Sequence, residues 1–451
     1  MDEAWVVAVD MGYGHQRAAY PFRDIAVERV VTANTDACVS AEERQLWLKF
    51  QGAYEGVSRF RKVPVVGPWL WNLYDRFQAI SPHYPFRDLS KPSFGSMRLH
   101  RLLGRGFGAS VVEHTRTRPE LPLLTTFFAV ALAADRAGRA NVFCVVTDTD
   151  VNRIWVAEKP RESRVVYLAP TPLNRVRLLQ YGVPPENVFV TGFPLPEENV
   201  RAAAADLRRR MTVLDAGGRF RGRYGEMLGA QLGAADEAPA GPLSITYAVG
   251  GAGAQAETAG DILASLAGPL REGRMRLNLV AGTRPEVERL FREAIAGLGL
   301  EPEIGRGVTI LSAPTKDEYF ARFNLLLHET DVLWTKPSEL CFYAALGLPI
   351  VMAPPLGAHE VRNQDVVLRV SAGQRQEDPR AAAEWLTDWC RIGLLAFNAF
   401  NGYLLMPREG AENIRKLLFA PDRSRVDLGP WAQVQLGQPL PAVHRPVAGG
   451  R

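Results

Sequence analysis

The first residues that could do chemistry stand in a glycine-containing turn near the start of the chain. The apolar run at 6–9 leads directly into Gly12, Gly14 and His15, and an alanine-rich helical pattern follows. Glycines after a strand let the backbone turn tightly and approach a ligand, and the N–H groups at the start of the next helix attract anions. Histidine ordinarily titrates near neutrality, so His15 could act as a general base; the alternative is a capping or packing role.

A second glycine turn opens the second half of the chain. The run ITYAVGGAGAQ at 245–255 passes from a strand pattern into Gly250, Gly251, Gly253 and Gln255. The first turn lacks the third glycine of the dinucleotide fingerprint, so we do not expect NAD. Each turn could be a plain tight turn, but the presence of one at the start of each half favours phosphate binding.

Polar residues follow another strand pattern, which ends at Thr335. Pro337, Ser338 and Glu339 are typical of a helix start, because proline is tolerated in the first turn and serine can cap it. That start could hold the diphosphate of a nucleotide and let Glu339 take ribose hydroxyls, or Glu339 could only complement the helix dipole. Polar side chains in the next loop could bind sugar hydroxyls or lie exposed; they are His359, Glu360 and Asn363.

The composition bounds the class of protein. The chain of 451 residues suits two domains, each of about 200 residues. Its 47% hydrophobic and 23% charged residues are typical of a globular protein, and a net charge of +4 does not predict nucleic-acid binding. Four scattered cysteines without a C-x-x-C pair argue against a zinc site and suit a reducing cytoplasm. The sequence shows no signal-peptide pattern and no long apolar run, so we expect a cytoplasmic protein.

Short apolar runs alternate with helix-length patterns almost throughout. This alternation predicts an α/β fold of two Rossmann-like domains, each with a doubly wound parallel sheet. Strand patterns in the first half cover 5–9, 27–32, 110–113, 141–147, 165–168 and 188–191, and five more follow Leu243. We expect one Rossmann-like domain over 1–198, a hinge or surface insertion at 199–241, a second Rossmann-like domain over 242–390, helices over 391–420 and a poorly ordered tail over 421–451.

The stretch 63–86 is rich in aromatic residues and follows the cations Arg59, Arg61 and Lys62. Aromatic side chains beside cations suit a membrane interface. An ordinary buried helix can have the same composition. The sequence leaves both interpretations open.

The order of these motifs resembles the GT-B glycosyltransferases, and most closely the monogalactosyldiacylglycerol synthases and the related N-acetylglucosaminyltransferase of lipid II. The resemblance covers roughly residues 5–370 and rests on GYGH, VVTDTDVNRIWV, YGVPPENVFVTGFPL, VGGAGAQ, TKPSELCFYAALGLPI and GAHEVRNQ. It implies two domains that face a cleft. The N-terminal domain would bind the acceptor, and the C-terminal domain would bind a nucleotide sugar, usually a UDP-sugar.

The resemblance also implies roles for single residues. His15 matches the histidine of the glycine loop, formed here by Gly12 and Gly14, and Asp148 matches an acidic residue on the acceptor side. The stretch 63–86 matches a membrane-associating region, which makes a lipid one candidate acceptor and peripheral membrane contact an expectation. Residues on the donor side match the loop beside the diphosphate (Gly250, Gly251, Gly253 and Gln255) and an element that touches sugar and ribose (Glu360 and Asn363, with His359 in place of the usual glutamine).

Besides His359, the sequence departs from the family at two further places. Phe342 or Tyr343 stands where members carry a glutamate further into the helix, so Glu339 would have to substitute for it. Asn152 and Arg153 stand where a histidine often follows the VTD element. These changes are compatible with another sugar, another nucleotide or a loss of transfer activity.

The resulting hypothesis is a glycosyltransferase that moves a hexose or N-acetylhexosamine from a nucleotide sugar to a hydroxyl acceptor. His15 or a nearby aspartate would take the proton, and no cofactor is expected. No metal is expected either, because the DTD at 148–150 falls in the acceptor half. One alternative is a nucleotide-sugar epimerase or hydrolase of the same fold. The other is a non-catalytic protein that binds a nucleotide sugar or a lipid.

Overall fold

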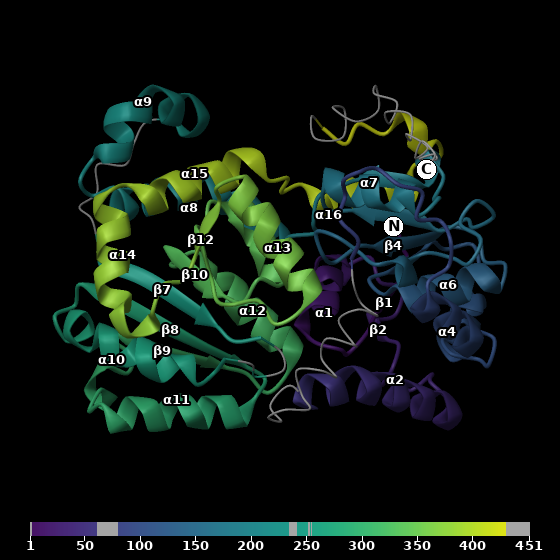
Figure 1. Ribbon diagram of the computed structural model, residues 1–451, viewed down its shortest axis with the longest axis horizontal. Coiled ribbons are helices and arrows are strands. Elements are labelled where there is room, and N and C mark those ends of the chain that lie inside the picture. The colour runs from purple at the N-terminus through teal and green to yellow at the C-terminus, as the bar shows by residue number, and fades with distance from the viewer. Residues whose placement is uncertain (1, 61–79, 234–240, 251–252, 254, 430–451) are drawn as a thin grey trace, which may run out of the picture. The chain divides into compact units, whose positions relative to one another are not determined.

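The chain divides into two compact units (Figure 1). A computed structural model describes residues 2–60, 80–233, 241–250, 253 and 255–429. The first unit comprises Met1–Pro194, Gly357–His359 and Glu409–Arg451, and the second comprises Leu195–Leu356 and Glu360–Arg408. Each unit is built on its own parallel sheet and is described by itself below.

The sheet of the first unit has six parallel strands in the order β2-β1-β3-β4-β5-β6. Successive side chains of a strand point to opposite faces, so Trp5 and Val7 of β1 join one apolar cluster while Val6 and Ala8 join another. Both faces of the sheet are therefore buried, as a doubly wound fold requires. The strands are β1 (Trp5–Ala8), β2 (Val31–Thr32), β3 (Leu123–Thr125), β4 (Val142–Val145), β5 (Val166–Ala169) and β6 (Val188–Val190).

Helices bury both faces of this sheet, and the last of them comes from the far end of the sequence. Ile414 and Leu417 of α16 share an apolar cluster with Val6 and Ala8. The α-helices are α1 (Tyr13–Ala19), α2 (Ala41–Phe60), α4 (Phe94–Leu103), α5 (Ala109–His114), α6 (Phe128–Arg136), α7 (Pro172–Gln180) and α16 (Gly410–Phe419). Short 3-10 helices are η1 (Tyr20–Phe22), η2 (Thr115–Thr117), η3 (Arg153–Trp155), η4 (Pro185–Asn187) and η8 (Arg423–Arg425).

The sheet of the second unit has the order β12-β11-β10-β7-β8-β9 and is also parallel. Its strands are β7 (Leu243–Ala248), β8 (Met275–Gly282), β9 (Val308–Ser312), β10 (Val332–Thr335), β11 (Ile350–Met352) and β12 (Gly373–Arg375). Its helices are α8 (Glu197–Leu214), α9 (Arg219–Leu232), α10 (Thr258–Arg271), α11 (Pro285–Gly297), η5 (Glu301–Glu303), α12 (Lys316–Leu327), η6 (Glu339–Leu346), α13 (Ala358–Arg369), η7 (Pro379–Ala381), α14 (Ala382–Arg391) and α15 (Leu394–Leu405). The first two residues of α13 group with the first unit.

The predicted fold class, two doubly wound parallel sheets, is confirmed. The predicted strand at 110–113 is wrong, because these residues lie in α5, and strands β3 and β12 were not predicted. The stretch 199–241, predicted as a hinge or insertion, contains most of α8 together with α9. Helix α8 packs within the second unit through the buried side chains of Leu207, Met211 and Leu214. The predicted cleft between the domains concerns their placement and stays a prediction.

The predicted C-terminal helices at 391–420 correspond to α15 and α16, which group with the second and the first unit respectively. Most of the predicted tail, residues 430–451, and most of the aromatic stretch, residues 63–79, lie outside the described residues. Within the part of the chain that the structure describes, no helix is long and apolar enough to cross a membrane. The expectation of a cytoplasmic protein stays a prediction.

Candidate functional site

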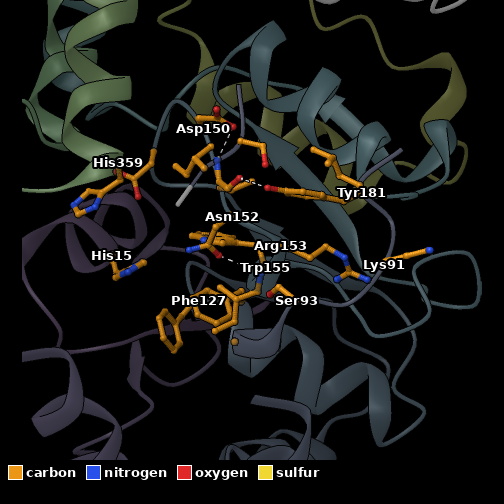
Figure 2. A pocket seen from close by; sticks show the side chains of 18 of the residues that line it. His15, Lys91, Ser93, Phe127, Asp150, Asn152, Arg153, Trp155, Tyr181 and His359 are labelled. Carbon is orange, nitrogen blue, oxygen red and sulfur yellow. Dashed lines mark hydrogen bonds between the residues drawn. The ribbon is translucent and has the colours of Figure 1, made fainter. Parts of the chain in front are cut away.

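A cavity of about 530 Å³ opens in the first unit where β1, β3 and β4 end (Figure 2). The carboxyl ends of parallel strands are where doubly wound sheets bind ligands. The residues after β1 supply His15 to the cavity, those after β3 supply Phe127, and those after β4 supply Asp148. Two of these three side chains, His15 and Asp148, are the predicted catalytic residues, so the structure brings both to one cavity.

The imidazole of His15 is held in one tautomer. Its Nδ1 lies 2.7 Å from the backbone oxygen of Thr126, and its ring packs edge-on against Phe127 with 5.1 Å between the centroids. A carbonyl oxygen only accepts hydrogen bonds, so Nδ1 carries the proton and Nε2 of the neutral ring is unprotonated. A general base needs that arrangement.

The glycine turn before His15 has a structural role. Gly12 precedes α1 with φ of +109°, a backbone conformation that side chains strongly disfavour. Gly14 lies inside the first turn of α1. Neither glycine lines the cavity, so the turn acts by placing His15.

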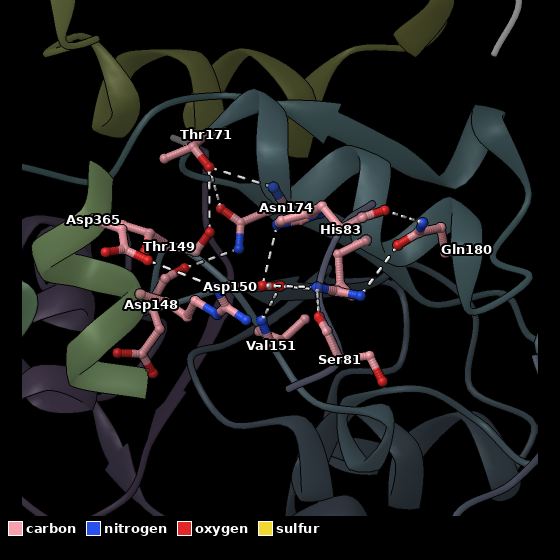
Figure 3. Close-up of polar contacts among 12 residues, drawn as sticks. Ser81, His83, Asp148, Thr149, Asp150, Val151, Thr171, Asn174, Gln180 and Asp365 are labelled. Carbon is pink, nitrogen blue, oxygen red and sulfur yellow. Dashed lines mark hydrogen bonds and ion pairs between the residues drawn. The ribbon is translucent and has the colours of Figure 1, made fainter. Parts of the chain in front are cut away.

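Asp148 is half-buried and begins the DTD sequence after β4. Asn174 of α7 donates from Nδ2 to the backbone oxygen of Asp148 at 3.0 Å, and Thr171 caps α7 through the backbone N–H of Asn174 (Figure 3). These contacts fix the backbone from which the Asp148 carboxylate reaches the cavity.

Asp150, the second aspartate of DTD, is committed to an ion-pair network. It is 2% exposed, and its carboxylate accepts hydrogen bonds from Arg177 at 2.9 and 3.0 Å and from the backbone N–H of Val151. Burial alone would raise the pKa of Asp150, but hydrogen bonds from His83 and Arg177 outweigh it and lower the pKa overall. The described residues include no group of three or more side chains placed to bind a metal ion.

In the second unit, Gly250 follows β7, Lys336 follows β10, and Glu360 of α13 comes together with them. The Nζ of Lys336 lies 2.6 Å from Oε1 of Glu360, and the backbone N–H of Leu356 donates to Oε2 of Glu360 at 2.6 Å. Glu360 is 2% exposed. A side chain on Gly250 would come within 2.6 Å of the Cε atom of Lys336, so this glycine allows the lysine to cross the loop.

The other residues predicted on the donor side contact the loops that follow the strands of this sheet. Asn363, fully buried, donates from Nδ2 to the backbone oxygen of Pro337 at 3.2 Å. Gln255 adopts φ of +68°, unusual for a residue other than glycine, and donates from Nε2 to Pro354 at 2.9 Å. Gly253 has φ of +71°, and a side chain there would meet Cγ2 of Val287 at 3.4 Å. Gly251 lies outside the described residues.

The predicted helix start at 337–339 differs from expectation. A 3-10 helix, η6, begins at Glu339, and Ser338 precedes it without capping it through its side chain. Phe342 and Tyr343, which stand in place of the family's glutamate, are 3% and 0% exposed. Both rings pack inside the unit, so neither is available to a ribose, whereas Glu339 remains half-buried at the start of η6.

His359 belongs to the short stretch that groups with the first unit, and it lines the cavity there (Figure 2). Sequence reasoning did not single out Lys336 or Arg177. The signal for Lys336 was present, because it directly follows the strand pattern that ends at Thr335. No comparable signal marked Arg177, which lies in the middle of a helix.

Comparison with known proteins gives few matches in sequence. A family profile described as "Domain of unknown function (DUF6938)" matches residues 236–373, most of which belong to the second unit. No curated protein sequence matches the chain.

Several solved structures resemble the chain at low sequence identity. S. aureus MnaA with UDP is 12% identical over 93% of this chain and 96% of that chain, with a TM-score of 0.48. UDP-GlcNAc 2-epimerase from Neisseria meningitidis bound to UDP-GlcNAc is 11% identical over 92% of this chain and 98% of that chain, with a TM-score of 0.47. Anabaena HepE in complex with UDP is 16% identical over 70% of this chain and 83% of that chain, with a TM-score of 0.39. Identities this low do not assign the substrates or reactions of these proteins to this chain.

Proposed function

We propose that the chain is a glycosyltransferase that moves a hexose or N-acetylhexosamine from a UDP-sugar to a hydroxyl group of a lipid acceptor. The observation that carries the proposal is His15, whose Nδ1 is tied to Thr126 at 2.7 Å in a cavity that it shares with Asp148. A histidine held in this tautomer can accept a hydroxyl proton on Nε2. This arrangement suits a reaction in which an acceptor hydroxyl loses its proton to His15 while its oxygen attacks a sugar.

The proposed donor site is the loop after β7 together with Lys336. The Gly250 position lets the backbone and a lysine side chain come together, as a diphosphate site requires. Glu360 holds the lysine from the other side at 2.6 Å. Asn363 holds the peptide of Pro337, so the loop that carries Lys336 is fixed at two points.

In the proposed reaction, the acceptor oxygen forms a bond to the anomeric carbon while its proton passes to Nε2 of His15. The bond from the anomeric carbon to the diphosphate oxygen breaks, and UDP leaves with the electron pair. Lys336 and the backbone N–H groups of the Gly250 loop stabilise the charge that develops on the leaving group. Donors of this kind typically lower a barrier by about 3 kcal/mol each. Asp150 is occupied by Arg177, which supports a reaction without a metal bound at DTD.

A lipid acceptor is supported by the exposed side chains of residues 84–101, a segment that begins within the described end of the aromatic stretch. Tyr84, Phe94 and Met97 are 64%, 56% and 37% exposed. Exposed cations accompany them in the same segment: Arg87, Lys91, Arg98 and Arg101. Exposed aromatic and basic side chains together favour an anionic membrane interface. Lys91 also lines the cavity, which links this segment to the proposed acceptor site.

A nucleotide-sugar epimerase is the second candidate. The observation that favours it is Glu360, a carboxylate beside the lysine of the proposed donor loop. An epimerase acts on the nucleotide sugar alone, so it would need neither the hydroxyl acceptor nor a membrane surface.

One assay separates these functions. The full chain is incubated with radiolabelled UDP-glucose, UDP-galactose or UDP-GlcNAc and with vesicles of diacylglycerol in anionic phospholipid. Label in the lipid fraction with equimolar UDP supports transfer. A new UDP-sugar formed without vesicles supports epimerisation, and UDP released without labelled lipid supports hydrolysis.

A histidine variant tests the role of the base. His15→Gln should lower the transfer rate by about 10²–10⁴-fold without weakening UDP binding. His100→Gln is the matched control, because His100 lies in the same unit on α4 and does not line the cavity. Equal losses in both variants would contradict the proposal.

A further inference from the structure

One wall of the cavity in the first unit is a segment without regular structure. Residues 80–93 form neither a helix nor a strand, yet Ile80, Ser81, Leu89 and Ser93 line the cavity. Such a segment has no ladder of backbone hydrogen bonds to hold it in place. The side chains that hold it therefore determine the shape of the cavity.

Arg177 is the centre of the group that holds this wall. Its side chain is fully buried, and it donates from Nε and Nη2 to the two oxygens of Asp150 at 2.9 and 3.0 Å. Nη2 also donates to the backbone oxygen of Ser81. A bidentate guanidinium–carboxylate pair inside a protein is strong and directional, so Ser81 is held by a rigid group.

Two further residues extend the network along the wall (Figure 3). Nε2 of His83 lies 3.2 Å from Oδ2 of Asp150. Gln180 accepts from Nη1 of Arg177 at 3.2 Å and donates from Nε2 to the backbone oxygen of His83 at 3.2 Å. The contacts of His83 connect the wall to the loop after β4 and to α7, whereas the hydrogen bond between Arg177 and Gln180 lies within α7.

The far part of the wall is held in the same manner. The backbone N–H of Leu89 donates to the backbone oxygen of Gln180 at 2.8 Å. Arg153, which is 6% exposed, donates from Nε and Nη2 to the backbone oxygen of Ser90 at 3.1 and 2.8 Å. Ser81 to Ser90 is thus fastened at both ends by buried arginines.

We infer that Arg177, acting through Asp150 and Gln180, is a positioning residue that sets the affinity of the cavity for its acceptor. Arg177 does not line the cavity, so it acts through the wall and not by touching the acceptor. The kinetic part of this inference rests on the proposed transferase function. The structural part, that the network holds the wall, does not depend on that function.

The test uses hydrogen exchange and steady-state kinetics on the full chain. Arg177→Met removes the centre of the network but leaves a buried carboxylate behind, so Gln180→Met serves as a second, milder variant. In both variants the amides of residues 80–93 should exchange at least about tenfold faster, while the sheet of the same unit keeps its protection. With the vesicle acceptor, KM should rise about tenfold, kcat should change by less than about threefold, and KM for the UDP-sugar should stay the same.

Arg139→Met is the matched control. Arg139 also binds backbone oxygens, those of Thr115 and Leu121, at 2.9 and 2.8 Å, but it does not line the cavity or touch the wall. It should leave exchange at 80–93 and the acceptor KM unchanged. Unchanged exchange at 80–93 in both network variants would overturn the inference, and so would a loss of kcat without a rise in acceptor KM. If the wild-type chain transfers no sugar, the proposed function fails, and the exchange data alone decide whether the network holds the wall.

Discussion

The ion pair of Lys336 and Glu360 should respond asymmetrically to the loss of either partner. The two groups are 2.6 Å apart, but the lysine side chain is 21% exposed whereas that of the glutamate is 3% exposed. Lys336→Met removes the cation that pairs with a buried carboxylate, and a loss of this kind typically destabilises a protein by about 3–5 kcal/mol. Glu360→Gln leaves a lysine that can turn toward water, so we expect a loss of only about 1–2 kcal/mol.

Urea unfolding of the two single variants and the double variant measures this difference. The double variant Lys336→Met/Glu360→Gln should be more stable than Lys336→Met alone, because it no longer contains a buried carboxylate that has lost its lysine. The matched control is Lys416→Met, since Lys416 pairs with Glu412 over the same 2.6 Å but the two side chains are 46% and 64% exposed. An exposed pair of this kind contributes about 0–1 kcal/mol. If Lys336→Met is no more destabilising than Glu360→Gln or than Lys416→Met, the reasoning about this pair is refuted.

Further predictions concern the base, the donor loop and a buried carboxylate. His15→Gln should lower kcat by about 10²–10⁴-fold with unchanged UDP affinity in calorimetry, and an unaltered kcat would exclude His15 as the base. Gly250→Ala should weaken UDP binding about tenfold or more, because the new methyl group meets Lys336 at 2.6 Å; unchanged affinity would remove the loop from the donor site. The pKa of Asp150 is lowered in the folded protein, so its carboxylate stabilises the fold at pH values above the ordinary aspartate pKa. This stabilisation is lost as the pH falls from the ordinary aspartate pKa through the lower pKa of the folded protein. The stability difference between wild type and Asp150→Asn should therefore shrink in urea titrations as pH falls below about 4, and a difference independent of pH would contradict this.

Most of the fold could be predicted, because buried parallel strands are marked by short apolar runs between helix-length patterns. The failure at 110–113 has a specific cause. Gly108 adopts a left-handed conformation before α5, and the carboxylate of Glu43 accepts from the backbone N–H groups of Gly108 and Ser110 at 3.0 and 2.7 Å. A side chain 65 residues away thus caps this helix, and no local pattern reveals such a contact.

The candidate site could be predicted only in part. His15 and Asp148 were recognisable because each follows a strand, and strand ends of a parallel sheet meet at one edge. The position of the Lys336 side chain depends on its contact with Glu360, a residue 24 positions away, and on the absence of a side chain at Gly250. The role of Arg177 depended on Ser81, 96 positions away. Contacts at such separations are set by tertiary packing, which periodicity does not encode.

The most direct test of the central claim is a calorimetric titration of UDP into the full chain. The account predicts saturable binding at one site, weakened at least about tenfold by Lys336→Met and left unchanged by His15→Gln. Absence of binding by UDP and by every UDP-sugar tried, or binding that Lys336→Met does not affect, would contradict the donor site on which the proposed transfer depends.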